Sequence, residues 1–285
     1  MSRHAFRAMG TTVELHLDAE PADAALLAAE AEMARLERLL SRFLPTSELS
    51  RLNSGGELAA GPDLLAVVAA ALDARELTAG RFDPTVHDAL VAAGYDRSFE
   101  LVAAGNGAPV LVGTRCGGGV AIDRAHGLIR LDPGVKLDLG GIAKGYAADR
   151  ALAILAPLGP ALVDAGGDVA VAGKPWPVGV ETALGPLTLE LSDGALATSG
   201  RDRRRWRASD GERHHLIDPA TGRPAEGDLL RVTALTATAV EAEVLAKALF
   251  LAGDADRAAA EADALGIPAV LVTRDGRTVL AGGLA

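Results

Sequence analysis

Cysteine, lysine and aromatic residues are all scarce in this chain of 285 residues. The single cysteine, Cys116, excludes an intrachain disulfide. Aromatic residues make up only 3% of the sequence, and the lysines are Lys136, Lys144, Lys174 and Lys247. Because arginine supplies nearly all the other basic groups, each lysine is a candidate for a specific role.

Long apolar runs are also missing. No stretch of eighteen apolar residues occurs, and the first twenty residues hold no basic segment followed by an apolar run. These absences argue against a transmembrane helix and against a signal peptide. We therefore expect a cytoplasmic protein with no membrane segment, unless an export signal has been removed.

Positive charge is outweighed by negative charge, with a net value of −10 at pH 7. Nucleic-acid binders gain affinity by neutralising phosphates with a basic face, so no nucleic-acid partner is expected. One local exception is the segment 201–207, which holds five arginines. We interpret it as a contact for phosphate or for a peptide.

A hydrophobic content of 49% over this length is enough for a substantial core, and we predict a single domain over residues 1–285. Residue patterns predict strands mixed with helices in no regular alternation, which favours an α+β architecture over a doubly wound parallel sheet. Helices are predicted over residues 22–40, 63–78, 143–156, 240–251 and 255–265. Strands are predicted over residues 11–17, 231–237 and 269–273, before a turn at Asp275-Gly276, and short strands within 98–133 and 161–191.

Five segments are dense in glycine, aspartate, histidine and hydroxyl residues: 9–11, 80–85, 138–145, 164–168 and 214–222. In the third, a predicted strand ends in Asp138, a Gly-Gly turn follows, and a helix begins near Lys144. Glycines let a backbone approach a ligand, and a helix N-terminus attracts phosphate. The alternative is an ordinary strand-to-helix turn. The segment matches neither the dinucleotide-binding fingerprint nor the P-loop.

The pair His214-His215 stands at the end of a predicted strand, just before a tight turn at Asp218-Pro219. An imidazole there can act as a general base or hold a ligand, although such a pair can also be structural or merely exposed. A zinc site is not expected, because Cys116 is isolated and no histidine pair has ligand spacing with a carboxylate.

Taken in order, the five segments resemble the ApbE family of FAD:protein FMN transferases. Further matches are Ser41-Arg42-Phe43 leading to the segment 47–53, Thr198-Ser199-Gly200, and the helix over 241–250. The resemblance runs from Met9 to about Gly253. It implies an ApbE-like (T-fold-like) α+β domain with two lobes and a flavin cleft between them.

The resemblance also implies roles for particular residues. Met9 and Phe43 would border the flavin or adenine, and His215 matches the family's functional histidine. The FAD site would be lined by Arg81, Phe82 and Asp83, with Asp138 and Lys144 at its polar parts. Family members use magnesium, bound by a backbone carbonyl at the position of Gly141 and by side chains on the late helix.

The implied reaction is attack of a serine or threonine hydroxyl of an acceptor protein on the FMN-side phosphorus of FAD, with AMP leaving. The base would be His215, with Asp168 as an alternative. Two other hypotheses remain: an FAD pyrophosphatase that releases FMN and AMP, and a non-catalytic FAD-binding protein. The arginines of 201–207 would then contact phosphate or an acceptor peptide.

The chain departs from the family in the late helix. The usual magnesium ligands are Asp at the position of Glu243 and Thr at the position of Lys247. A glutamate can still bind magnesium, but an ammonium group cannot. Either magnesium sits differently here or Lys247 replaces it as a catalytic cation. The simpler alternative is an exposed Glu243–Lys247 pair.

Overall fold

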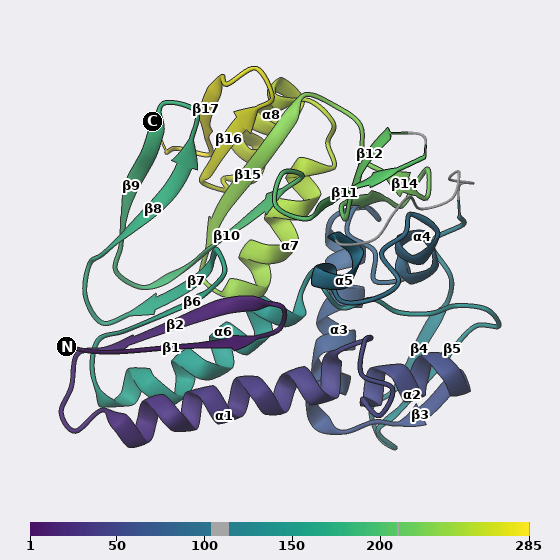
Figure 1. Ribbon diagram of the computed structural model, residues 1–285, viewed down its shortest axis with the longest axis horizontal. Helices are drawn as coiled ribbons and strands as arrows, with labels where there is room; N and C mark the ends of the chain where they lie inside the picture. The colour runs from purple at the N-terminus through teal and green to yellow at the C-terminus, as the bar shows by residue number, and fades with distance from the viewer. Residues whose placement is uncertain (104–113, 210, 285) are drawn as a thin grey trace. The chain divides into compact units, whose positions relative to one another are not determined.

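The computed structural model describes residues 1–103, 114–209 and 211–284 (Figure 1). Its contacts divide the chain into two compact units. Unit 1 comprises Met1–Glu37, Ile142–Gly200 and Gly227–Ala285, and unit 2 comprises Arg38–Gly141 and Arg201–Glu226. Each unit therefore combines segments that are far apart in the sequence. The single domain over residues 1–285 stays a prediction.

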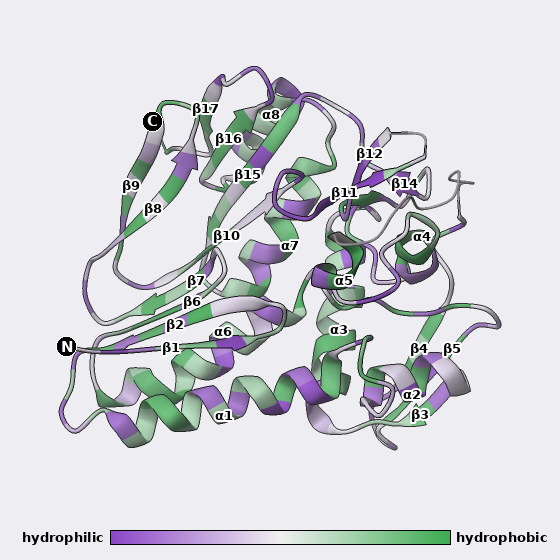
Figure 2. Cartoon of the chain, in the orientation of Figure 1, coloured by the Kyte–Doolittle hydropathy of each residue, from purple (hydrophilic) through white to green (hydrophobic). Residues whose placement is uncertain are grey.

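Unit 1 is built on an eight-stranded sheet with the order β1-β2-β6-β7-β10-β15-β16-β17, in which every neighbouring pair is antiparallel. Its strands are β1 (Ser2–Ala8), β2 (Thr11–Leu17), β6 (Ala161–Ala165), β7 (Asp168–Ala172), β10 (Gly194–Gly200), β15 (Leu229–Thr236), β16 (Ala269–Thr273) and β17 (Thr278–Ala281). A separate hairpin, β8 (Trp176–Thr182) with β9 (Gly185–Leu191), adds apolar side chains such as Trp176 and Val178 to a core with Val169 and Leu196. Figure 2 shows apolar residues along β15 and β16.

Helices α6 (Ala143–Leu155) and α7 (Ala239–Phe250) pack on this sheet, α6 against β6 and β7 and α7 against β10 and β15. Helix α1 (Asp23–Leu40) begins in unit 1, and α8 (Ala255–Leu265) packs on β16 and β17. A short 3-10 turn, η1 (Ala156–Leu158), follows α6. The N-termini of α6 and α7 are where the functional side chains of unit 1 gather.

Unit 2 combines short helices with small sheets. Its elements are α2 (Glu48–Gly55), β3 (Glu57–Ala59), α3 (Pro62–Leu77), α4 (His87–Ala92), α5 (Phe99–Ala103), β4 (Val120–Asp123), β5 (Leu128–Leu131), β11 (Arg205–Ala208), β12 (Gly211–His214), β13 (Ile217–Asp218) and β14 (Arg223–Pro224). One core joins the two sequence segments of the unit, because Tyr95 and Leu90 pack with Trp206 and Ile217.

The predicted α+β class is confirmed, and the helices α1, α3, α6, α7 and α8 lie within two residues of their predicted bounds. Two predictions are wrong. Residues 99–103, within the region of predicted short strands, form helix α5, while residues 104–113 lie outside the described part.

The second error is the strand predicted to end in Asp138, since the last strand before it ends at Leu131. The backbone N–H and C=O of Leu137 instead bond to the side chain of Asn53, each at 2.8 Å. The N–H of Asp138 donates to the carbonyl of Pro84 at 2.8 Å. These partners satisfy the extended backbone without a neighbouring strand.

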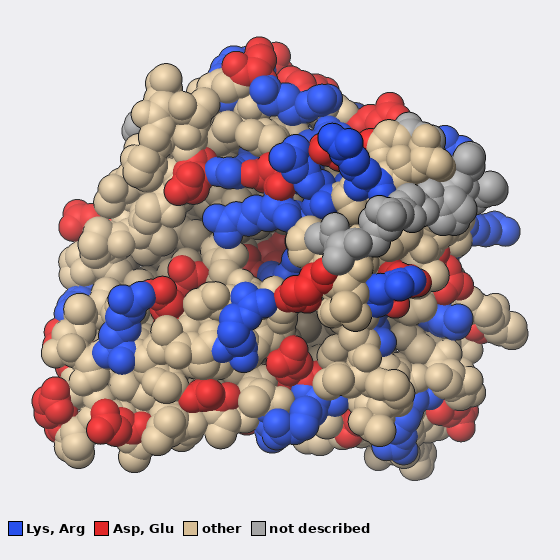
Figure 3. Space-filling view, viewed as in Figure 1, with Lys and Arg blue, Asp and Glu red and all other residues tan. Residues whose placement is uncertain are grey.

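Acidic and basic side chains stand beside one another on the face in Figure 3. Exposed ion pairs include Arg277–Asp256 in unit 1 and Arg205–Glu212 in unit 2. Such exposed pairs contribute little to stability. No helix in the described part of the chain combines the length and the apolar character needed to cross a membrane.

Candidate functional site

A polar cluster of unit 1 joins one ammonium group to two buried carboxylates. Lys144 lies in the first turn of α6, Asp168 begins β7, and Glu243 lies near the start of α7. The Nζ atom of Lys144 donates to Asp168 Oδ2 and, at 2.6 Å, to Glu243 Oε1. The side chains of Asp168 and Glu243 are only 3% and 5% exposed, so these are buried ion pairs.

Close packing of α6 on α7 brings these groups together. A Cβ atom at Gly145 would lie 2.4 Å from the carbonyl oxygen of Ala239, so only glycine allows this approach. The backbone N–H of Gly145 donates to Glu243 Oε2 at 2.9 Å. Asp149, one turn later, accepts from the backbone N–H groups of Ala239 and Val240 at the N-terminus of α7. The helix start is therefore tied to α6 by two carboxylates.

Burial sets the electrostatics of the cluster. It raises the pKa of Asp168 to about 6, with the charge of Glu243 acting in the same direction and the Lys144 ammonium opposing it. The charge of Lys247, one turn beyond Glu243 on α7, also lowers the pKa of Asp168. Burial likewise raises the pKa of Asp149. The cluster therefore brings two buried carboxyl groups together with the positive charges of Lys144 and Lys247.

Two further glycine-rich segments lie next to this cluster. Met9 and Gly10 form the tight turn between β1 and β2, with φ values of 52° and 71°. Gly166, in the turn before β7, has a φ of 74°, and a Cβ atom there would overlap the hydroxyl of Thr11. The segments 9–11 and 164–168 are therefore neighbours, and Asp168 directly follows that turn.

The predicted metal ligands do not fit a divalent ion. Both carboxylate oxygens of Glu243 already accept hydrogen bonds, one from Lys144 and one from Gly145. Gly141 is buried, and metal binding by its backbone carbonyl stays a prediction. Among the described residues, no three His, Cys, Asp or Glu side chains form a group that could hold a metal ion. The alternative of an exposed Glu243–Lys247 pair is wrong, because Glu243 is buried.

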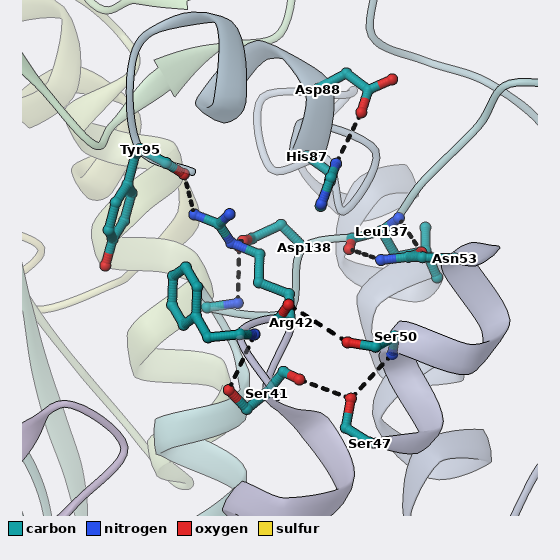
Figure 4. A network of polar contacts seen from close by, with 12 residues as sticks. Ser41, Arg42, Ser47, Ser50, Asn53, His87, Asp88, Tyr95, Leu137 and Asp138 are labelled. Atoms are coloured by element: carbon teal, nitrogen blue, oxygen red, sulfur yellow. Dashed lines mark hydrogen bonds and ion pairs between the residues drawn. The ribbon is translucent and has the colours of Figure 1, made fainter. Parts of the chain in front are cut away.

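Unit 2 has its own polar and aromatic cluster around Arg42 (Figure 4). The Arg42 side chain is 5% exposed, and it pairs with Asp138 at 2.5 Å and donates to the carbonyl of Tyr95 at 2.6 Å. Its guanidinium lies 4.2 Å from the ring centre of Phe43 and 4.8 Å from that of Tyr95. Arg42 thus orders two predicted site residues, Phe43 and Asp138. Sequence analysis missed this role, although Arg42 stands within a matched motif.

The predicted FAD-lining residues Arg81, Phe82 and Asp83 follow helix α3 in unit 2. Phe82 is buried, and Asp83 Oδ1 accepts from the backbone N–H and the hydroxyl of Thr85 at 2.8 and 2.7 Å. Arg75 lies 3.4 Å from the other oxygen of Asp83. These contacts fix the turn at 83–85, and a ligand contact by the three residues stays a prediction.

The two adjacent histidines differ in role. His214 ends β12 and is buried; its Nδ1 accepts from the N–H of Leu216, so its Nε2 carries the hydrogen and donates to the carbonyl of Ala225 at 3.0 Å. His215 is half-buried, and its Nδ1 faces the carbonyl oxygen of Arg204 at 3.4 Å. A carbonyl only accepts, so Nδ1 carries the hydrogen and the lone pair of neutral His215 is on Nε2. That tautomer suits a general base.

The buried His214 should make the protein sensitive to acid. Burial, helped by the charge of Arg201, lowers the pKa of His214 from 6.5 to about 4. The unfolded chain therefore binds a proton between these values that the folded chain does not, and stability is lost as pH falls through this window. The loss is about 2–3 kcal/mol. We expect His214→Gln, which keeps a donor for Ala225, to lose correspondingly less stability between pH 8 and pH 5 in urea unfolding. An equal loss in both proteins would refute this.

The fold and these clusters together define an α+β protein with a buried lysine–carboxylate site at the N-termini of two packed helices. The family model described as "ApbE family" matches residues 9–277. The chain belongs to the ApbE family.

Several relatives support this membership. The FAD:protein FMN transferase of Vibrio cholerae is 30% identical over 295 residues, which cover 93% of this chain and 85% of that protein. That of Treponema pallidum is 30% identical over 186 residues. The match spans about half the length of the Treponema and Klebsiella pneumoniae relatives, 51% and 49%.

Solved structures agree in fold. The ApbE protein of Thermotoga maritima has a TM-score of 0.87 and 28% identity, with 98% of this chain and 96% of that chain covered. The apo flavinyl transferase ApbE of Pseudomonas stutzeri has a TM-score of 0.82 and 23% identity, with coverage of 98% and 94%, and it supports the fold alone.

Proposed function

We propose that this protein moves FMN from FAD to a serine or threonine hydroxyl of an acceptor protein and releases AMP. The observation that carries this proposal is the match along 93% of the chain to a Vibrio cholerae protein named FAD:protein FMN transferase. The buried Lys144 cluster, in the motif that suggested a phosphate site, supports it.

The reaction balances without a redox step. The acceptor oxygen forms a bond to the FMN-side phosphorus of FAD, and the bond from that phosphorus to the bridging oxygen breaks. The hydroxyl proton passes to a base, and AMP leaves with the bridging oxygen. The enzyme must therefore supply a base near the hydroxyl and positive charge near the diphosphate.

We assign the base to His215 rather than to Asp168. The neutral His215 ring has its lone pair on Nε2, whereas an oxygen of Asp168 accepts from Lys144. Positive charge would come from Lys144 and Lys247. Contacts of FAD with Met9, Phe43, Arg81, Phe82, Asp83 and Asp138 are part of the same proposal.

Incubation with FAD separates this function from its two alternatives. A transferase leaves covalent flavin on an acceptor protein together with AMP. An FAD pyrophosphatase, in which water replaces the hydroxyl, releases free FMN and AMP. A non-catalytic FAD-binding protein leaves FAD unchanged. Chromatography of the nucleotides and in-gel flavin fluorescence distinguish these outcomes.

A site for the whole dinucleotide should prefer FAD over FMN. Charged hydrogen bonds to the diphosphate are worth roughly 1.5–3 kcal/mol, so FAD should bind about ten- to a hundredfold more tightly than FMN. Flavin fluorescence titration with FAD, FMN and riboflavin measures this. Equal affinity for FAD and riboflavin would contradict a diphosphate site.

A further inference from the structure

The buried cluster of unit 1 contains its own cations beside Glu243, the carboxylate that was predicted to bind magnesium. Lys144 donates to both Asp168 and Glu243, and its side chain is only 16% exposed. The second oxygen of Glu243 accepts from Gly145. Both oxygens of the carboxylate that α7 offers therefore already accept from donors of the chain itself.

Lys247 adds a second positive charge to the cluster around Asp168. It lies one turn after Glu243 on α7, is partly buried, and interacts electrostatically with Asp168. The two carboxylates and the two ammonium groups sum to zero charge. A divalent ion entering here would be repelled by both lysines and would have to displace Lys144 from buried partners.

Magnesium chemistry makes this displacement unfavourable. The ion requires a near-octahedral set of oxygen ligands, and a lysine ammonium has no lone pair to offer. Lys144 offsets the charge of the buried carboxylates, and the Lys247 ammonium can pair with a diphosphate without a metal.

We propose that this protein binds the diphosphate of FAD without a divalent cation, with Lys144 and Lys247 as fixed internal cations in place of the metal. Lys144 is a positioning residue that holds Asp168 and Glu243, and Lys247 faces the negative charge of the ligand. The proposal rests on the proposed function only in taking FAD as the ligand.

The test compares FAD affinity of the intact protein in excess EDTA and in excess MgCl₂, by flavin fluorescence and calorimetry. The two dissociation constants should agree within about twofold, and MgCl₂ alone should give no binding heat with the FAD-free protein. A magnesium-induced gain in FAD affinity of about tenfold or more, or saturable heat from MgCl₂ alone, would overturn the proposal.

Variants of Lys247, with a matched lysine control, test the charge at this position. Lys247→Met should weaken FAD binding about tenfold in EDTA, whereas Lys174→Met, a matched control elsewhere in unit 1, should leave it unchanged. The double variant Glu243→Asp with Lys247→Thr should acquire a magnesium-dependent FAD affinity. Unchanged binding by Lys247→Met would overturn the proposal, and the EDTA comparison stands even if the double variant does not fold.

The readouts also separate this inference from the proposed transfer reaction. FAD binding that is indifferent to magnesium, with no AMP or covalent flavin formed, would sustain the cation assignment and refute the transferase. Transfer that ceases in EDTA, together with magnesium-dependent FAD binding, would support the transferase and refute the cation assignment.

Discussion

Replacement of His215 by alanine is expected to slow FMN transfer by about 100- to 10,000-fold, the usual contribution of a positioned general base. FAD affinity and thermal stability should change little, because the His215 ring is half-buried and its Nδ1 lies a long 3.4 Å from the carbonyl oxygen of Arg204. Single-turnover measurement of AMP release, with FAD saturating, isolates this step.

The chain offers a matched control in His126, whose side chain is 78% exposed and pairs with Asp123. His126→Ala should transfer FMN at the wild-type rate. Wild-type transfer by His215→Ala would show that the base lies elsewhere, and Asp168→Asn would then be the variant to measure.

Replacement of Lys144 by methionine should destabilise the fold by about 3–5 kcal/mol, because it removes the cation from a buried ion-pair cluster. Asp168 and Glu243 would lose their cationic partner in surroundings where their side chains are 3% and 5% exposed. The cost should appear as a lower midpoint of urea unfolding at pH 8.

Neutralising the two carboxylates supplies the control for this prediction. Glu243→Gln keeps an acceptor for the N–H of Gly145, and Asp168→Asn keeps the shape of the side chain. Combined with Lys144→Met, these changes should restore more than half of the lost stability. If Lys144→Met alone unfolds at the wild-type midpoint, the buried cluster does not exist as described.

Sequence patterns alone located the helices whose ends are marked by capping residues. Helix α8 begins after Asp254, whose side chain accepts from the N–H of Arg257, and ends at Gly266 with a left-handed φ of 63°. Such caps lie within a few residues of the helix, so sequence periodicity and end signals locate it.

Contacts between residues far apart in the sequence explain the predictions that were wrong or missing. The segment before Asp138 reads as a strand, but its backbone bonds to Asn53, 84 positions earlier in the chain. Lys144 and Glu243 are 99 positions apart, and no spacing rule predicts their contact. The family resemblance marked both residues as site residues. It did not indicate that they bond to each other, which is the contact behind the proposed metal-free site.

The pairing of Arg42 with Asp138 was missed for the same reason. Arg42 stands 96 positions before Asp138, and a single arginine in a matched motif carries no sign of its partner. The one available signal was the adjacent Phe43, since arginine often stacks on aromatic rings.

Transfer of FMN to a protein hydroxyl can be detected by tandem mass spectrometry of the modified acceptor. The purified protein is incubated with FAD and a protein extract of the cells that produce it, and flavin-fluorescent bands that survive denaturation are digested. We expect a peptide whose serine or threonine carries one FMN, with loss of one water, and an equal amount of AMP. Free FMN and AMP without a modified peptide, or FAD left intact, would contradict it.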